Sequence, residues 1–140
     1  MTKELPAAEK SENAMRIMVV DDNEASADTL HWAVELMGYD VRSCHDGQSA
    51  LRLATDFRPD VVLLDIGMPH MDGLEVGRAL RTMPGLSGIK IIAQTGWGDS
   101  QTRRQTAEAG FDLHLVKPVN MDTLEDMLWL LRSNAGRLAA

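Results

Sequence analysis

The 140-residue sequence contains little cysteine, few aromatic residues and no long apolar run. Its single cysteine, Cys44, excludes an internal disulfide and has no neighbours at metal-ligand spacing. The longest apolar stretches are short segments such as 61–64, far below the roughly 20 residues that cross a bilayer. Residues 1–13 also lack the apolar core of a secretory signal, so we expect a cytoplasmic protein with no membrane segment.

Positive charge is scarce as well. The chain has 14 Lys and Arg residues against 21 Asp and Glu residues, which gives a formal net charge of -7. Basic residues form no cluster beyond the pair Arg103 and Arg104, whereas nucleic-acid binding surfaces are strongly basic. We therefore expect no direct binding to nucleic acid.

The residues that are present predict one globular α/β domain. Hydrophobic residues make up 44% of the chain and charged residues 25%, as in soluble domains. Short apolar runs alternate with segments of helical periodicity, which favours a doubly wound parallel sheet with helices on both faces. We expect a flexible N-terminal tail at 1–14, a domain at 15–133, a C-terminal tail at 134–140 and no output domain. The expected strands are 17–20, 40–44, 61–64, 89–93 and 113–116, and the expected helices are 24–37, 48–57, 74–83, 100–109 and 121–132.

Chemically active residues follow four of these strands. Asp21 and Asp22 come after the first, Asp65 after the third, Thr95 after the fourth and Lys117 after the fifth. Ligands of open parallel sheets bind at the carboxyl ends of the strands, so these side chains should converge. Clustered carboxylates repel one another and need positive charge, which Lys117 and a hard cation such as Mg²⁺ or Mn²⁺ would supply. A carboxylate can also act as a nucleophile toward a phosphoryl group.

The order and spacing of these motifs resemble the receiver domains of two-component signal transduction, the CheY-like response regulators. The likeness extends from Arg16 to Leu131. It implies a flavodoxin-like (βα)5 fold with the strand order 2-1-3-4-5. The motifs that carry it are Asp21-Asp22, Asp65 with Met68-Pro69 and Met71-Asp72-Gly73, Thr95-Gly96, and Lys117-Pro118.

The resemblance also implies roles for the acidic residues. Asp65 would be the phosphoryl acceptor, which makes the protein an aspartyl phosphoprotein. Asp22 and Asp65 would ligate Mg²⁺ together with the carbonyl of Gly67, and Asp21 would assist through water.

The resemblance implies further roles near the ends of the last two strands. At two positions in this region the sequence departs from the family's usual residues. Thr95 and Lys117 would contact the phosphoryl oxygens, Thr95 would take part in the switch, and the bond between Lys117 and Pro118 would be cis. His114 stands where the family usually has a Tyr or Phe that turns inward. It is either a modified, pH-sensitive switch residue or a strand residue that fills space. Trp97 is bulkier than its counterpart in many relatives and could cover the phosphoryl group.

The function that these implications favour is a phosphorylation-controlled binding module. A histidine kinase or a histidine phosphotransfer protein would donate the phosphoryl group, and a downstream protein would read the change by direct contact. The chain would catalyse only its own phosphorylation and dephosphorylation, either as a single-domain regulator in a phosphorelay or as a segment of a hybrid kinase. One alternative is an aspartate-nucleophile phosphatase, although such enzymes usually carry a second acid where this chain has Gly67. The other alternative is a receiver-like binding module that works without phosphorylation.

Two tryptophans lie on the polar faces of their predicted helices. Trp32 lies opposite the apolar face of the first helix, and Trp129 lies among the acidic residues of the last. Both should therefore be exposed. They mark a surface for a partner or a homodimer, or they are lone exposed aromatic residues.

Overall fold

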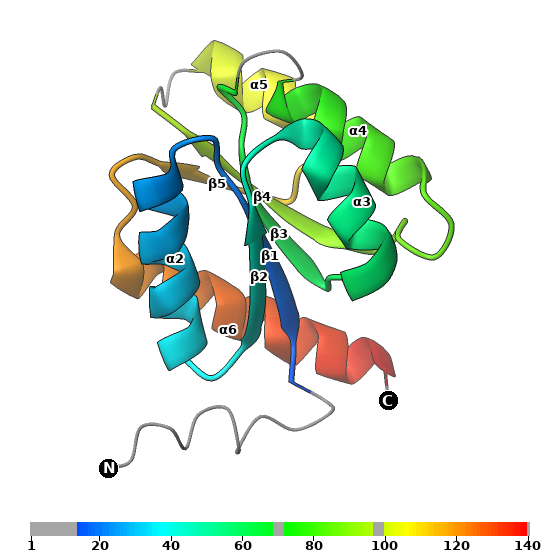
Figure 1. Cartoon of the computed structure of the whole chain (residues 1–140). Coiled ribbons are helices and arrows are strands. Elements are labelled where there is room, and N and C mark those ends of the chain that lie inside the picture. Colours follow the sequence, from blue (N-terminus) through cyan, green and yellow to red (C-terminus); the bar gives the residue numbers. More distant parts are fainter. Residues whose placement is uncertain (1–13, 69–71, 97–99, 140) are drawn as a thin grey trace.

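The computed structural model describes residues 14–68, 72–96 and 100–139, with side chains described up to Arg132. The expected N-terminal tail up to residue 13, Pro69, Met71 and Trp97 lie outside these residues. Strands and helices alternate along the chain (Figure 1). The elements are β1 (Arg16–Val20), α2 (Glu24–Leu36), β2 (Asp40–Cys44), α3 (Gly47–Phe57), β3 (Val61–Asp65), α4 (Gly73–Thr82), β4 (Lys90–Thr95), α5 (Ser100–Glu108), β5 (Leu113–Val116) and α6 (Met121–Ala139).

The five strands form one parallel sheet in the order β2-β1-β3-β4-β5, as expected for the doubly wound fold. Helices α2 and α6 cover one face of the sheet, and α3, α4 and α5 cover the other (Figure 1). The strand order reverses between β1 and β3, because the chain crosses to opposite sides of β1. In such sheets the reversal opens a crevice at the carboxyl ends of the strands.

Most element boundaries lie within one residue of the sequence prediction, and the differences at β3, β4 and α6 bear on the site or the tail. Strand β3 includes Asp65 and β4 includes Thr95, because the parallel ladder continues through the pairs Asp65 with Gln94 and Thr95 with Val116. Helix α6 was expected to end at Arg132, but it continues to Ala139. The expected C-terminal tail is therefore helical up to residue 139, and no proline between residues 133 and 139 interrupts the helix.

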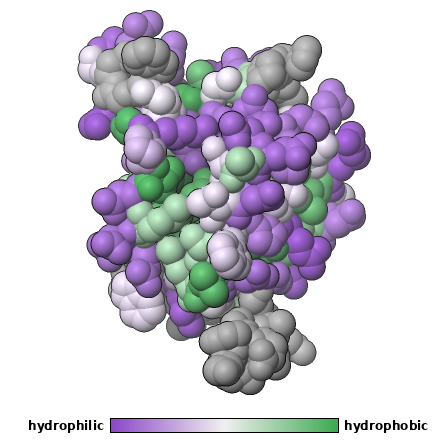
Figure 2. Space-filling view, turned by 60° about the vertical axis from the view of Figure 1, so that its left-hand side comes forward, coloured by the Kyte–Doolittle hydropathy of each residue, from purple (hydrophilic) through white to green (hydrophobic). Residues whose placement is uncertain are grey.

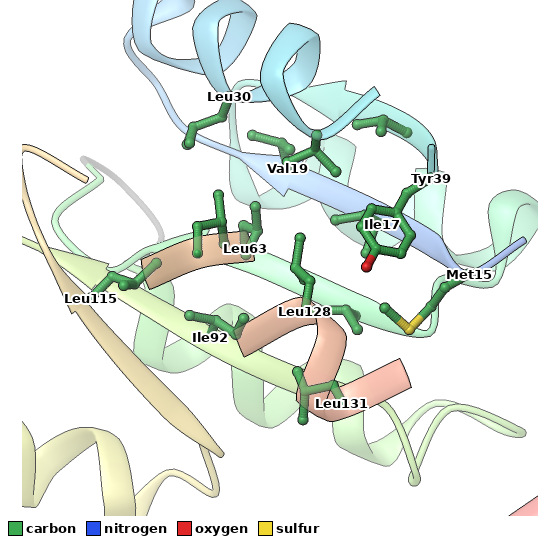
Figure 3. Close-up of a cluster of buried hydrophobic side chains, with 14 of the residues drawn as sticks. Met15, Ile17, Val19, Leu30, Tyr39, Leu63, Ile92, Leu115, Leu128 and Leu131 are labelled. Atoms are coloured by element: carbon green, nitrogen blue, oxygen red, sulfur yellow. The ribbon is translucent and has the colours of Figure 1, made fainter. Parts of the chain in front are cut away.

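One hydrophobic core fills the space between the sheet and helices α2 and α6 (Figure 3). Ile17, Leu63 and Ile92 project from three adjacent strands and contact Leu30 of α2 and Leu128 of α6. All five side chains are buried. Because side chains alternate along a strand, the next residues of the same strands face the opposite core.

The second core lies between the sheet and helices α3 and α4. Val62, Leu64 and Ile91 form its sheet side. Gly77 in the middle of α4 allows the ring of Phe111 to approach, because a Cβ at this position would lie 2.7 Å from Cζ of Phe111. The two cores hold the central strands rigidly and so fix the positions of the residues at their ends.

Side chains at the carboxyl edge of the sheet also start the helices. Asn23, Asp46 and Asp72 are the N-caps of α2, α3 and α4, and each accepts a hydrogen bond from a backbone N–H in the first turn. Asp72 and Glu75 form a reciprocal capping box. Within the described part of the chain, no helix is both long and apolar enough to cross a membrane.

Candidate functional site

Three carboxylates meet at the carboxyl edge of the sheet, where the sequence predicts a site. Asp21 and Asp22 directly follow β1, and Asp65 is the last residue of the neighbouring strand β3. One carboxylate oxygen of each lies within 4.8 Å of the others. Asp21 and Asp65 are buried, whereas Asp22 is exposed. Two carboxylates of the cluster are therefore buried, and the third, that of Asp22, reaches solvent.

Lys117 bridges two of these acids from the end of β5. Its Nζ lies 3.2 Å from Oδ2 of Asp65 and 3.3 Å from Oδ2 of Asp21. Its backbone N–H donates to the carbonyl of Thr95 at 2.7 Å, which anchors the residue to the end of β4. With three carboxylates around one ammonium group, the site keeps an excess of negative charge.

Backbone groups orient the two buried carboxylates. Oδ1 of Asp65 accepts a hydrogen bond from the N–H of Gly67 at 2.9 Å, and Oδ1 of Asp21 accepts one from the N–H of Asn23 at 2.9 Å. The start of α4 packs against the backbone after β3, since a Cβ on Gly73 would lie 2.5 Å from the carbonyl oxygen of Asp65. The absence of a side chain at Gly73 thus lets the helix close on the loop that carries Gly67.

Burial and charge shift the pKa values within the cluster. Burial raises the pKa of Asp21 above its usual value, and the hydrogen bond from Asn23 and the charge of Lys117 offset this only in part. Burial acts to lower the pKa of Lys117, but the carboxylates of Asp65 and Asp21 outweigh it and raise that pKa. Lys117 is therefore fully charged at neutral pH.

The remaining predicted residues lie along β4 and β5. Thr95 is buried at the end of β4, and the bond between Lys117 and Pro118 is cis, as the resemblance implies. His114 is half-buried, and neither ring nitrogen has a hydrogen-bond partner among the described residues. Burial, and then the charge of Arg103, lower its pKa. A neutral, unpartnered imidazole supports the interpretation that His114 fills space.

The donors of the cluster fit a hard divalent cation. Mg²⁺ prefers oxygen ligands and is usually held by one or two carboxylates, carbonyl groups and water. Asp21, Asp22 and Asp65 offer three carboxylates, and Gly67 lies two residues beyond Asp65 with its N–H on that carboxylate. The excess negative charge left by Lys117 gives a cation an electrostatic reason to bind here.

Sequence reasoning missed one polar residue at this edge. Gln94, next to Thr95 on β4, has a side chain that is only 1% exposed. Neither its Nε2 nor its Oε1 has a hydrogen-bond partner among the residues that the structure describes. A glutamine directly after the apolar residues 91–93 of β4 was the signal that could have drawn attention to it.

The two tryptophans and the cysteine lie away from the carboxylate cluster. Trp32 is 68% exposed and Trp129 is 62% exposed, as their helix positions predict. Cys44 is buried, and burial together with the nearby charge of Asp46 raises its pKa to about 12. The thiol is therefore protonated and unreactive at neutral pH.

Comparison with known proteins shows to which family the chain belongs. A family model described as the response regulator receiver domain matches residues 17–129. The chain belongs to this family. Among curated receiver-containing proteins, it is 38% identical over 119 residues to the response regulator MprA of Mycobacterium avium, and this match covers 85% of the chain and 50% of MprA. It is 33% identical over 118 residues to the protein of Synechocystis named DNA-binding dual master transcriptional regulator RpaA, covering 84% of the chain and 48% of that protein.

Solved structures of receiver domains have the same fold. The chemotaxis protein CheY4 of Vibrio cholerae superimposes with a TM-score of 0.81 at 28% identity, covering 84% of this chain and 98% of CheY4. The receiver domain of a signal transduction histidine kinase from Syntrophus aciditrophicus superimposes with a TM-score of 0.78 at 30% identity, covering 86% and 92%. The chain thus spans about half the length of the curated relatives but almost a whole CheY4.

Proposed function

We propose that this receiver domain accepts a phosphoryl group on Asp65 from a histidine kinase or a histidine phosphotransfer protein. A carboxylate oxygen of Asp65 attacks the phosphorus, and the phosphorus–nitrogen bond of the donor phosphohistidine breaks. The leaving imidazole keeps the electron pair and takes up a proton, and Asp65 becomes an acyl phosphate. Water later attacks the phosphorus, which releases inorganic phosphate and restores the carboxylate. The chain catalyses these two steps on itself and no other reaction.

The other residues of the cluster hold charge and position. Asp22 and Asp65, with the carbonyl of Gly67 and with Asp21 through water, are the residues that would hold Mg²⁺. The bound cation would neutralise charge on the transferred phosphoryl group. Lys117 and Thr95 contact the phosphoryl oxygens, through the ammonium and hydroxyl groups respectively.

The observation that carries this proposal is the position of Lys117 Nζ, 3.2 Å from Oδ2 of Asp65 in a cluster that holds two more carboxylates. A carboxylate that pairs with a lysine could simply stabilise the fold, but a structural ion pair of that kind needs no further carboxylates beside it. Here the additional carboxylates repel Asp65, which favours a site built to receive a cation and an incoming phosphoryl group.

The experiment is incubation of the purified chain with acetyl phosphate and Mg²⁺, followed by intact mass measurement and peptide mapping. We expect a single phosphoryl adduct on the peptide that contains Asp65. Asp65→Asn should abolish it, whereas Asp56→Asn, a matched change at an exposed carboxylate on α3, should leave it unchanged. Removing the divalent cation with EDTA should also prevent the adduct.

The same experiment separates the alternatives. A wild-type chain that forms no adduct with acetyl phosphate or with a phosphorylated histidine phosphotransfer protein would instead support the phosphorylation-independent binding module. Multiple turnover of p-nitrophenyl phosphate, lost in Asp65→Ala, would support a phosphatase.

The output that we propose is contact with a downstream protein in the cytoplasm rather than with nucleic acid. The exposed rings of Trp32 and Trp129, on neighbouring helices, are our candidates for a partner or homodimer surface. Replacing both with Gln should slow phosphotransfer from the cognate donor or abolish self-association. Unchanged values for both would remove this surface from the proposal.

A further inference from the structure

The three most exposed large hydrophobic side chains among the described residues lie on two neighbouring helices. They are Trp32 and Leu36 of α2 and Trp129 of α6, and Leu36 is 66% exposed. Figure 2 shows the side of the molecule on which α2 lies, where a band of hydrophobic surface crosses an otherwise hydrophilic face. Apolar groups that gather on one side of a soluble domain often mark a site of protein contact.

On α2 the exposed apolar residues belong to a stripe that faces α6. This stripe consists of Ala25, Thr29, Trp32 and Leu36, which recur at intervals of three or four residues and so share one face of the helix. Ala25 and Thr29 line a cavity together with Met121, the first residue of α6. Trp32 and Leu36 therefore continue along the side of α2 that is turned toward α6.

A matching stripe on α6 faces α2. It consists of Met121, Glu125, Trp129 and Arg132, which also recur at intervals of three or four residues. The last three of these line a pocket of about 350 Å³ together with Met37, which follows α2. The two stripes thus border one groove, the α2–α6 groove, which runs for about three helical turns, or about 16 Å.

Carboxylates surround both tryptophan rings of the groove. The carboxylates within one helical turn of the rings are Asp28 and Glu35 on α2 and Glu125 and Asp126 on α6. The described side chains of the two helices carry six carboxylates in all and one guanidinium group, that of Arg132. Cζ of Arg132 lies 5.7 Å from the centre of the Trp129 ring and offsets only part of this negative charge.

Apolar anchors among carboxylates select the occupant of the groove. An amphipathic helix can lay its apolar face in a groove of this length, and basic residues beside that face would pair with the carboxylates. A second copy of the chain would instead bring the same carboxylates against these, and like charges repel. Nucleic acid and anionic membranes would meet the same repulsion.

The groove leads away from the carboxylate cluster. Leu131, in the second half of α6, lines a pocket with Met15 and Pro59 at the amino edge of the sheet. Helix α6 therefore runs from the carboxyl edge to the amino edge, and Trp129 lies in its amino-edge half. A helix bound beside Trp129 would leave Asp65 open to a phosphoryl donor.

We propose that the α2–α6 groove docks an amphipathic helix of a partner protein that presents lysine or arginine beside its apolar face. The proposal rests on the partner surface proposed above and names its occupant, but it does not depend on phosphoryl acceptance by Asp65. Trp32 and Trp129 are the apolar anchors, and the carboxylates around them select the basic partner over a second copy of the chain.

The test is a titration of the full ¹⁵N-labelled chain with a peptide of leucine and lysine about 14 residues long, with all leucines on one helical face. Calorimetry gives the affinity, and NMR reports on the indole N–H groups of Trp32 and Trp129. Mg²⁺ and phosphodonors are left out, so failure of this test and failure of phosphoryl acceptance are separate results. One control peptide has glutamate in place of lysine, and another distributes the leucines around the helix. We expect saturable shifts of both indole groups and about tenfold weaker binding of either control.

Substitution of the anchors tests whether the peptide binds in the groove. Trp32→Gln and Trp129→Gln should each weaken binding about tenfold. Val116→Gln, a matched loss of an exposed apolar side chain on β5, should leave the affinity unchanged. Since all three positions are exposed, the variants should fold, and their ¹⁵N spectra check this.

A second pair of variants tests the charges. Glu125→Gln combined with Asp126→Asn should weaken binding about threefold, and less so at high salt. Asp56→Asn combined with Glu108→Gln removes the same charge from exposed positions of α3 and α5, outside the groove, and should leave the affinity unchanged.

Three results would overturn the proposal. The first is the absence of saturable binding, or binding that both tryptophan variants retain in full. The second is equal affinity for the lysine and glutamate peptides. The third is self-association of the free chain that Trp32→Gln or Trp129→Gln abolishes, since a second copy would then be the occupant of the groove.

Discussion

The two ends of the sheet use their charged residues in opposite ways. At the amino end, Oδ2 of Asp60 accepts a hydrogen bond from the N–H of Arg16 at 2.8 Å. Oδ2 of Asp112 accepts one from the N–H of Ile91 at 2.8 Å and pairs with Nη2 of Arg81 at 2.9 Å. At the carboxyl end, three carboxylates gather around one ammonium group.

This difference separates charges that hold the fold from charges that serve a site. Each amino-end acid satisfies a backbone N–H of a neighbouring strand, so its removal leaves a donor without a partner. The carboxyl-end acids repel one another, so the removal of one relieves repulsion as well as breaking contacts. Stability measurements and phosphorylation measurements should therefore respond differently at the two ends.

The largest expected effect is that of Gly73→Ala at the carboxyl end. The new Cβ would meet the backbone of Asp65 and Ile66, which cannot move aside as a side-chain tip can. We expect a loss of about 3 kcal/mol in the free energy of unfolding, at the upper end of overpacking costs, and slower phosphorylation. Urea denaturation and the acetyl phosphate assay measure the two quantities.

Gly88→Ala is the matched control for this change, because a Cβ there would have no neighbour within 4 Å. It should leave stability and phosphorylation unchanged. Equal stability of the two variants would show that α4 does not press on the backbone after β3.

At the amino end, Asp112→Ala should lower the free energy of unfolding by about 2 kcal/mol, because it leaves the N–H of Ile91 and one side of Arg81 without their partner. The variant should still form the adduct on Asp65 with wild-type kinetics at a temperature where it is folded. Asp56→Ala, at an exposed position of α3, is the control and should change neither quantity. Loss of the adduct in folded Asp112→Ala protein would abolish the distinction between the two ends.

Asp21→Asn should change the free energy of unfolding by less than Gly73→Ala or Asp112→Ala does. It should raise this free energy rather than lower it. Burial raises the pKa of Asp21, so the folded protein binds a proton at this carboxyl more readily than the unfolded chain does. The wild type is then penalised at neutral pH and recovers stability as the pH falls through the raised pKa, whereas the variant has no such dependence. We expect Asp21→Asn to be the more stable protein at pH 7 without divalent cations.

Urea denaturation of both proteins between pH 7 and pH 4, in EDTA, measures this difference. The advantage of the variant should shrink as the pH falls. A difference that grows toward low pH would mean that Lys117 and Asn23 outweigh burial at Asp21.

The sequence alone predicts most of the fold and the cluster for a simple reason. The apolar run at 61–64 has the pattern of a strand covered on both faces, and the acid after such a strand is expected at the carboxyl edge of the sheet. Asp21 and Lys117 follow from the same argument, so their meeting with Asp65 is a consequence of parallel topology. This is why residues far apart in the chain could be placed together without coordinates.

What could not be predicted depends on neighbours in space. The strands extend through Asp65 and Thr95 because hydrogen bonds to adjacent strands continue there, and hydrophobicity does not record these bonds. The unpartnered state of Gln94 depends on which side chains fail to reach it. Helix α6 passes its expected end at Arg132 because stop signals are weak and helix ends are set by packing as much as by sequence.

The smallest expected effect is that of His114→Phe on β5, three residues before Lys117. Burial, and then Arg103, lower the pKa of His114, so the unfolded chain binds the proton more readily as the pH falls below the usual histidine value. The wild type should therefore lose stability relative to the variant below about pH 6.5, the ordinary histidine pKa.

At pH 8 the variant should be more stable by up to about 1 kcal/mol, because a ring without polar atoms replaces one whose nitrogens have no partner in the described structure. Thermal denaturation at both pH values measures this, and equal pH profiles would mean that the imidazole of His114 reaches water in the folded protein. Phosphorylation of the variant at the wild-type rate would place His114 with the residues of the fold rather than with those of the carboxyl-end site.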